Sequence, residues 1–205
     1  MKSVVIIGAG DLGKEVVWII EDINRIKPSY MILGFLDDDA DKLGEEFYGY
    51  KVLGGIDALE SLSERTPFGA ILAIQDGSTR KRIVENHSSF KRWETIIHPS
   101  AVVASSSKVG TGSIVFPQTV ISVDSKMGDF CLYYTRSTIC CDCELGSFVS
   151  LMTGASVLEH TKIGDECFLS TGSCVRDYRT LGNRVKVAVK ETVSDDCDDD
   201  VLVGM

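Results

Sequence analysis

The chain has 205 residues, 44% hydrophobic and 25% charged, which is the composition of a soluble globular protein long enough for two modest domains. Its net charge of −9 argues against a nucleic-acid or anionic-membrane surface. The sequence has no signal peptide, and no apolar run approaches the ~20 residues that span a bilayer. Seven cysteines in such a chain indicate a reducing compartment and not a disulfide framework. We therefore expect a cytoplasmic protein with neither nucleic-acid nor membrane partners.

The first segment has the pattern of a strand, a glycine turn and a helix. A β-branched, apolar run over residues 2–7 leads into a GxGxxG loop formed by Gly8, Gly10 and Gly13, and residues 14–24 show helical spacing. In this context the glycines permit a tight turn, and the helix N-terminus offers free N–H groups to a phosphate. The segment therefore predicts a Rossmann-like nucleotide-binding fold.

A second predicted strand, residues 31–36, ends in Asp37 and Asp38. An acidic residue at this place commonly holds a ribose hydroxyl in nicotinamide dinucleotide folds. The next strand, residues 69–74, is followed by Gln75, Asp76 and Gly77 and by a helix, with no hydride-transfer site after it. Three interpretations stay open: a nicotinamide dinucleotide site, a loop whose glycines only make a turn, and a mononucleotide or nucleotide-sugar site, which we favour. His98 beside Pro99, where the two parts join, is interpreted as a hinge residue and not a catalytic one.

From Val103 to Val193 the sequence repeats in blocks of six. An apolar residue opens each block, at Val103, Val109, Val115, Ile121, Met127, Tyr133, Ile139, Leu145, Leu151, Val157, Ile163, Leu169, Val175, Leu181, Val187 and Val193. The fifth place is usually small, and glycine follows the opening residue in every third block, at Gly110, Gly128, Gly146, Gly164 and Gly182. A period of six within a period of eighteen predicts three short strands per turn of a triangular coil, stacked at about 4.8 Å.

We therefore predict a left-handed parallel β-helix of roughly five coils over residues of about 100 to 193. The opening residues should point inward, and the glycines should relax the backbone at one corner. The expected domains are 1–97, Rossmann-like and nucleotide-sugar-binding, and 98–205, an acyltransferase β-helix with an acidic, solvated C-terminal tail at residues 195–200. Cys143 should face inward and Cys140 outward, so joint metal ligation by this CxxC pair is not expected.

The chain resembles the bacterial sugar acyltransferases of the sialic-acid O-acetyltransferase type. The resemblance rests on the combination of GAGxxGxE at Gly8, the acidic strand end, the segment IHPSA at Ile97 and the β-helix. Relatives of that type N-acetylate UDP-4-amino-sugars with acetyl-CoA. The resemblance implies homotrimers, with acetyl-CoA in the groove between neighbouring β-helices and the nucleotide-sugar on the N-terminal domain. Its implied sugar-nucleotide contacts are Gly8, Gly10, Gly13, Asp37, Asp38, Gln75, Asp76 and Gly77, and its implied acyl-CoA contacts are Ser150, Glu159 and Thr171.

The sequence departs from the family pattern where the catalytic histidine is expected. Cys141 stands in its place, followed by Asp142, which keeps the carboxylate of the family motif. Cys141 as a nucleophile would need a lowered pKa, and Asp142 acts in the opposite direction. Because one coil is eighteen residues, Glu159 should stack over Cys141 and His160 over Asp142, about 5 Å away. A Glu159/His160 pair could then act as a displaced base.

The predicted function is acyl transfer from a CoA thioester to a sugar or nucleotide-sugar in bacterial surface-glycan biosynthesis. For an amine acceptor, Asp142 or His160 would take the proton. The alternative is a catalytically impaired relative that binds a nucleotide-sugar or serves as a trimeric partner. A purely structural scaffold is a further alternative, against which the intact glycine loop argues. No metal site is predicted.

Overall fold

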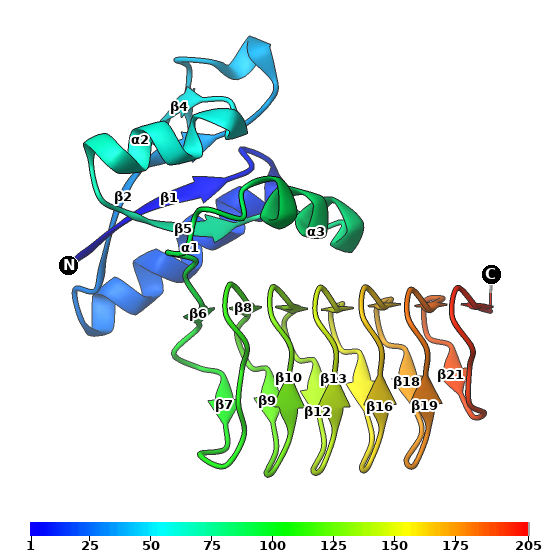
Figure 1. The fold of residues 1–205 in the computed structure, drawn as a ribbon. Coiled ribbons are helices and arrows are strands. Elements are labelled where there is room, and N and C mark those ends of the chain that lie inside the picture. The colour runs from blue at the N-terminus through cyan, green and yellow to red at the C-terminus, as the bar shows by residue number, and fades with distance from the viewer. Residues whose placement is uncertain (205) are drawn as a thin grey trace. The chain divides into compact units, whose positions relative to one another are not determined.

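The computed structural model describes residues 1–204, which divide into two compact units, one spanning Met1–Ile96 and one beginning at Ile97 (Figure 1). Each unit has its own sheet system. No helix among residues 1–204 is long and apolar enough to cross a membrane.

The first unit is an α/β layer built on a five-stranded sheet of order β3-β4-β2-β1-β5. Its strands are β1 (Lys2–Ile7), β2 (Tyr30–Leu36), β3 (Glu46–Phe47), β4 (Tyr50–Gly54) and β5 (Gly69–Leu72). Its helices are α1 (Asp11–Ile26), α2 (Leu59–Arg65) and α3 (Gly77–Asn86), with the short 3-10 turns η1 (Ala40–Lys42) and η2 (Ile56–Ala58). All strand pairs are parallel except β3 with β4, so the sheet is mixed.

Sequence chemistry explains the first strand–turn–helix unit. Val4 to Ile7 are fully buried, as expected for a strand covered on both faces. Helix α1 buries a stripe that includes Val16, Val17 and Ile20. It ends at Ile26 because Pro28 disfavours helical backbone at Lys27, which is extended with φ −149° and ψ 120°.

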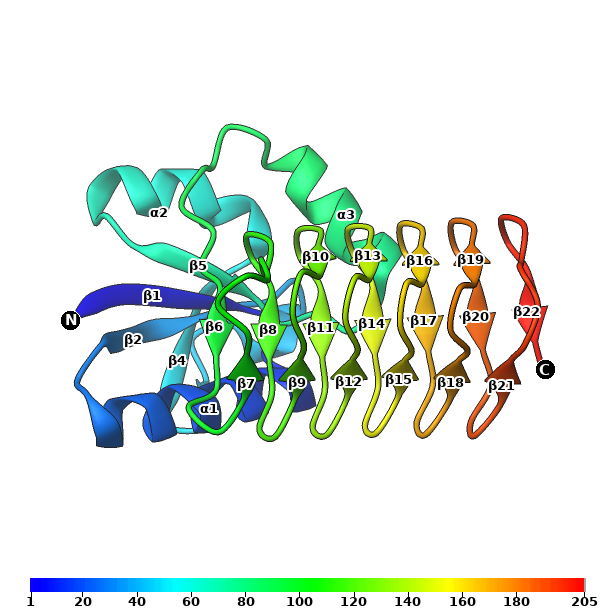
Figure 2. The ribbon, with the colours of Figure 1, turned by 90° about the horizontal axis from the view of Figure 1, so that it is seen from below.

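The second unit is a parallel β-helix, as the repeat predicts. Its strands have two residues each: β6 (Ile96–Ile97), β7 (Val102–Val103), β8 (Ile114–Val115), β9 (Val120–Ile121), β10 (Lys126–Met127), β11 (Leu132–Tyr133), β12 (Thr138–Ile139), β13 (Glu144–Leu145), β14 (Ser150–Leu151), β15 (Ser156–Val157), β16 (Lys162–Ile163), β17 (Phe168–Leu169), β18 (Cys174–Val175), β19 (Thr180–Leu181), β20 (Lys186–Val187), β21 (Thr192–Val193) and β22 (Leu202–Val203). They form three parallel sheets of four, seven and six strands. Figure 2 shows β8, β11, β14, β17 and β20 side by side in the seven-stranded sheet.

The opening residues of the blocks form the core of the coil, as predicted, and those from Val115 to Val193 are all buried. The small fifth places also point inward and link successive coils. Ser125 Oγ donates to Cys140 O at 2.8 Å and accepts from the backbone N–H of Cys143 at 3.1 Å. Serine, threonine and cysteine suit this place because each is small and can satisfy a buried backbone group.

The repeating glycines have a different role from the one predicted. Gly110, Gly128, Gly146, Gly164 and Gly182 are not in the left-handed region, which is occupied at other corners mostly by non-glycine residues such as Asp142 and His160. A Cβ on Gly146 would instead lie 2.8 Å from Asp165 N and 2.8 Å from Gly164 C in the next coil. The prediction that these glycines relax the backbone is therefore wrong, because it is the close approach of adjacent coils that excludes a side chain.

The acidic run is not a tail. Residues 195–200 form a further coil that leads into β22, which pairs with β20. Asp199 Oδ1 accepts from the backbone N–H of Asn183 at 2.8 Å, and Asp200 forms an ion pair with Arg184 at 2.6 Å. These partners are sixteen residues apart instead of eighteen. Because the last coil is two residues shorter, the period of six breaks there, and the sequence pattern does not reveal it.

Candidate functional site

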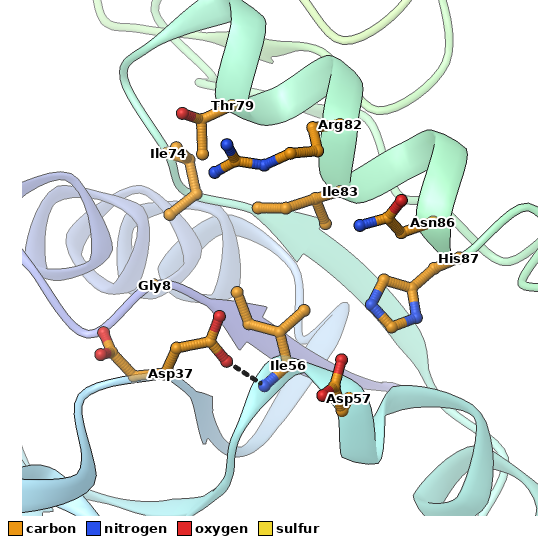
Figure 3. Close-up of a pocket in the computed structure, with 11 residues that line it drawn as sticks. Gly8, Asp37, Ile56, Asp57, Ile74, Thr79, Arg82, Ile83, Asn86 and His87 are labelled. Atoms are coloured by element: carbon orange, nitrogen blue, oxygen red, sulfur yellow. Dashed lines mark hydrogen bonds between the residues drawn. The ribbon is translucent and has the colours of Figure 1, made fainter.

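The first unit has a cleft of about 270 Å³ at the carboxyl ends of β1 and β2, beside α3 (Figure 3). It is lined by Gly8, Asp37, Asp38, Ile56, Asp57, Ile74, Thr79, Arg82, Ile83, Asn86 and His87. Ligands of open parallel sheets bind at this end of the strands. Gly8, Asp37 and Asp38 are thus the predicted site residues that the fold brings to one cleft.

The three glycines of the loop differ in what they permit. Gly8 has φ +104°, and a Cβ on it would lie 2.6 Å from Ala73 O. A Cβ on Gly13 would lie 2.3 Å from Gly8 O, so this glycine allows α1 to pack against the turn. A Cβ on Gly10 would meet nothing within 4 Å. Gly8 and Gly13 are therefore required by the turn itself, whereas Gly10 has room for a side chain.

Asp37 and Asp38 are both held by backbone N–H groups. Asp37 Oδ2 accepts from Ala9 N at 2.7 Å and Oδ1 from Asp39 N at 2.9 Å, while Asp38 Oδ1 accepts from Ile56 N at 2.8 Å. Partial burial by itself raises the pKa of Asp37, but these backbone N–H groups and the Lys42 ammonium lower it below its ordinary value.

This arrangement bears on the nicotinamide interpretation. In dinucleotide folds the pyrophosphate lies on the N–H groups of the glycine loop. Here the Ala9 N–H is already bound by the Asp37 carboxylate, whose charge would also repel a pyrophosphate at that point. The geometry therefore disfavours a dinucleotide whose pyrophosphate lies on the glycine loop. The part of the cleft that remains available to a ligand is the part beside α3.

The segment after β5 shapes the cleft beside α3. Asp76 caps α3 by accepting from Thr79 N at 2.8 Å and from Ser78 Oγ at 2.7 Å, and these hydrogen bonds lower its pKa. The buried Arg80 guanidinium donates to Ile74 O at 3.0 Å and to Gln75 O at 2.6 Å. Gln75, Asp76 and Gly77 do not themselves line the cleft, although Ile74 and Thr79 on either side of them do.

Sequence reasoning missed the far end of the cleft. His87 lines it, and its Nδ1 lies 2.8 Å from Glu60 Oε2 on α2. Asp57 and Asn86 line the cleft nearby, and Arg82 supplies a guanidinium on α3. Residues 56–60 belong to no recognisable motif, so only the folded chain brings them beside α3. A polar face of the third helix, carrying Thr79, Arg82 and Asn86, is the signal that the sequence did contain.

On the β-helix, His160 stacks beside Asp142 as the eighteen-residue period predicts. The backbone N–H of His160 donates to Cys141 O at 3.1 Å, and Nδ1 lies 3.9 Å from Asp142 Oδ2. The Tyr178 ring stacks on the imidazole from the next coil, with centroids 4.7 Å apart. The His160 side chain is 43% exposed.

The surroundings of Cys141 keep it a thiol. Partial desolvation raises its pKa first, and a hydrogen bond to Asp142 together with the carboxylates of Asp142 and Glu159 raises it further. Thiolate nucleophiles require the opposite surroundings. The neighbouring Cys143 is buried in the coil, and burial raises its pKa to about 11. All seven cysteines lie within residues 1–204, and none of them is in a disulfide.

The predicted acyl-CoA residues do not form one patch within a single chain. Ser150 is a buried residue of β14 in the seven-stranded sheet. Thr171 is exposed at the corner between β17 and β18, and Glu159 is exposed at the corner between β15 and β16.

His98 has a local structural role. Its buried ring accepts a hydrogen bond at Nδ1 from the backbone N–H of Ser100 at 3.0 Å and lies 2.9 Å from Ser100 Oγ. The interpretation of His98 as a hinge residue stays a prediction. Residues 1–204 contain no group of three histidine, cysteine or acidic side chains that could hold a metal ion.

An α/β domain followed by a parallel β-helix of hexapeptide repeats is the architecture of hexapeptide-repeat acyltransferases with an N-terminal α/β domain. Residues 3–87 match the PglD N-terminal domain. The acetyltransferase domain of PglB from Neisseria gonorrhoeae FA1090 in complex with acetyl coenzyme A is 31% identical. That comparison covers 98% of this chain and 95% of the other, with a TM-score of 0.86.

Two further proteins are similar. Perosamine N-acetyltransferase from Caulobacter crescentus, solved as a histidine-to-asparagine variant with CoA and GDP-perosamine, is 28% identical with a TM-score of 0.89. The comparison covers 98% of this chain and 93% of the other. UDP-N-acetylbacillosamine N-acetyltransferase from Bacillus subtilis (strain 168) is 30% identical over 118 residues, 56% of this chain. The match spans about half, 51%, of that curated relative. The chain belongs to the PglD-type sugar N-acetyltransferase family.

Proposed function

We propose that the protein transfers the acetyl group of acetyl-CoA to the amino group of a nucleotide-linked sugar. The observation that carries the proposal is the likeness over 98% of the chain to an acetyltransferase domain that binds acetyl coenzyme A. The relative from Bacillus subtilis is named for a UDP-linked sugar, and the perosamine N-acetyltransferase was solved in complex with a GDP-linked sugar. A role in the building of bacterial surface glycans, in the cytoplasm, follows from this activity.

The sugar nucleotide would bind in the cleft of the first unit. The Arg82 guanidinium on α3 would meet the phosphates, and Gly8 and Gly13 would hold the turn of the glycine loop, whereas Gly10 is not among the residues that line the cleft. Asp37 and Asp38, at the end of β2, would accept hydrogen bonds from ribose hydroxyls. Gln75, Asp76 and Gly77 would act by shaping the start of α3, since none of the three lines the cleft.

His160 would act as the general base. Asp142 Oδ2 lies 3.9 Å from its Nδ1, so the carboxylate stands on that side of the ring, and Nε2 would be the atom that meets the substrate. His160 would take the proton that the sugar amine loses as the new C–N bond forms and the C–S bond of the thioester breaks. Cys141 would contribute shape and not nucleophilicity, because its thiol is protonated.

The acyl-CoA site would lie between copies of the chain. Ser150, Glu159 and Thr171 occupy different parts of one β-helix, so a groove formed with a second β-helix is the simplest way for one ligand to reach them. A homotrimer supplies three such grooves by closed symmetry. The exposed corners at Glu159 and Thr171 are consistent with this arrangement.

A second candidate is a catalytically impaired member of the family that binds a nucleotide-sugar and serves as a partner or scaffold. The specific observation in its favour is Cys141, a thiol with a raised pKa where the family pattern expects a histidine. This candidate keeps the cleft and the trimer but has no turnover.

The experiment incubates the full chain with acetyl-CoA and a panel of UDP- and GDP-linked amino-sugars and detects the product by mass spectrometry. We expect one of the amino-sugars to gain a single acetyl group with release of free CoA. Binding of a nucleotide-sugar without any acetylated product would favour the impaired relative instead.

A further inference from the structure

The far end of the cleft holds a histidine whose orientation is fixed. His87 follows α3, and its Nδ1 lies 2.8 Å from Glu60 Oε2. The other oxygen of Glu60 accepts a hydrogen bond of 3.0 Å from Ser89 Oγ. Figure 3 shows the imidazole turned toward the cleft, with Asp57 on the facing segment.

Glu60 determines which ring nitrogen of His87 carries the hydrogen. Burial by itself raises the pKa of this carboxyl, but hydrogen bonds from His87 and Ser89 lower it below its ordinary value. The ionised carboxylate can only accept, so the hydrogen on Nδ1 points at Glu60. In the neutral imidazole, Nε2 then has a lone pair and accepts a hydrogen bond from a ligand in the cleft.

The charges along α3 give a nucleotide its direction in the cleft. Thr79 lies in the first turn of α3, where the helix dipole favours an anion, Arg82 lies near the middle of the helix, and Asn86 and His87 lie at its end. The eight steps from Thr79 to His87 rise about 12 Å along the helix, a length comparable with that of a nucleoside diphosphate. Phosphates at the Arg82 end therefore place the base at the His87 end.

Building on the proposed function, we propose that His87, held by Glu60, selects the nucleobase of the sugar nucleotide. Its Nε2 accepts a hydrogen bond from the ring N–H of uracil, thymine or guanine. Cytosine and adenine present a lone pair at the corresponding ring nitrogen, so two acceptors would face each other without a hydrogen. The relatives named for UDP- and GDP-linked sugars both use a base with such an N–H.

The test is calorimetric titration of the full chain with UDP, GDP, CDP and ADP in mildly alkaline buffer. We expect UDP and GDP to bind about tenfold more tightly than CDP and ADP. His87→Phe keeps a ring but removes Nε2, so the preference for UDP over CDP should fall below about threefold through weaker UDP binding, with CDP affinity retained. Glu60→Gln, whose amide can also donate to Nδ1, should reduce the preference in part. Glu64→Gln, an exposed change on the same helix, should leave it intact.

Equal affinity for all four nucleotides, or an unchanged preference in both His87→Phe and Glu60→Gln, would overturn the assignment of His87 while leaving the nucleotide site in place. Absence of binding for all four nucleotides would overturn the nucleotide site as well, and with it the proposed function. Thermal unfolding of each variant separates loss of fold from loss of recognition.

Discussion

Gly146 explains why a glycine recurs every eighteen residues. Its backbone approaches the next coil so closely that a Cβ would lie 2.8 Å from Gly164 C, although its own φ is not in the left-handed region. Gly154 is the matched opposite, with φ +69° and nothing within 4 Å of the place where a Cβ would lie. Gly146 is thus required because there is no room for a side chain, whereas Gly154 is favoured only because its backbone is in the left-handed region.

Gly146→Ala should therefore destabilise the fold by about 1–3 kcal/mol through overpacking, measured by chemical denaturation. Gly154→Ala should cost about 1 kcal/mol or less, because left-handed strain is partly offset by a less flexible unfolded chain. A larger loss for Gly154→Ala than for Gly146→Ala would contradict the steric explanation.

Asp37 connects the glycine loop to β2, so its charge should contribute to stability as well as to the cleft. Asp37→Asn removes the charge and one acceptor from the pair of N–H groups at Ala9 and Asp39, at a cost of about 1–2 kcal/mol at neutral pH. The folded-state pKa is lowered, so this stabilisation is complete above the ordinary carboxyl pKa and is lost as the pH falls through the lowered value.

The difference in unfolding free energy between the native chain and Asp37→Asn, followed from neutral to acidic pH, checks this prediction. The gap should narrow only as the pH drops below the ordinary range of an aspartate carboxyl. A difference in unfolding free energy that stays constant to strongly acidic pH would mean that the charge of Asp37 contributes nothing to stability.

The last coil is the element in which the structure differs most from the prediction, since residues 195–200 were expected to form a solvated tail. Val203 in β22 packs against the β-helix core together with Cys197 and Val201. Val203→Asp should cost about 1–3 kcal/mol and lower the unfolding temperature, because a carboxylate would be placed against an apolar core. Leu202→Asp, on the outward side of the same strand, is the control. Equal thermal stability of both variants and the native chain would restore the tail interpretation.

The repeat could be predicted because each inward position meets the same requirement in every coil, so the pattern persists from Val103 to Val193. The hairpin of β3 and β4 and helix α2 could not, since they are short and their apolar residues follow no sustained period. The glycine loop, Asp37 and Asp38 could be located from a motif. His87 and Glu60 could not, because they are distant in sequence and meet only through the packing of α2 beside α3.

For the whole molecule, the proposed acyl-CoA site depends on assembly. Sedimentation or light scattering of the full chain should give three times the mass of one chain, since the proposed acyl-CoA groove is formed between two copies in a closed trimer. A monomer at micromolar concentration would remove the intersubunit groove and leave these residues without a common ligand.

The central claim, acetyl transfer with His160 as a displaced base, is tested most directly by mass-spectrometric turnover of the native chain, His160→Ala and Cys141→His with acetyl-CoA and the accepted amino-sugar nucleotide. We expect acetylated product from the native chain and a loss of about 10²–10⁴-fold in His160→Ala, the usual contribution of a general base. A native chain without product whose activity appears in Cys141→His would contradict the displaced base, and would identify a family member that keeps its cleft but has lost its catalytic histidine.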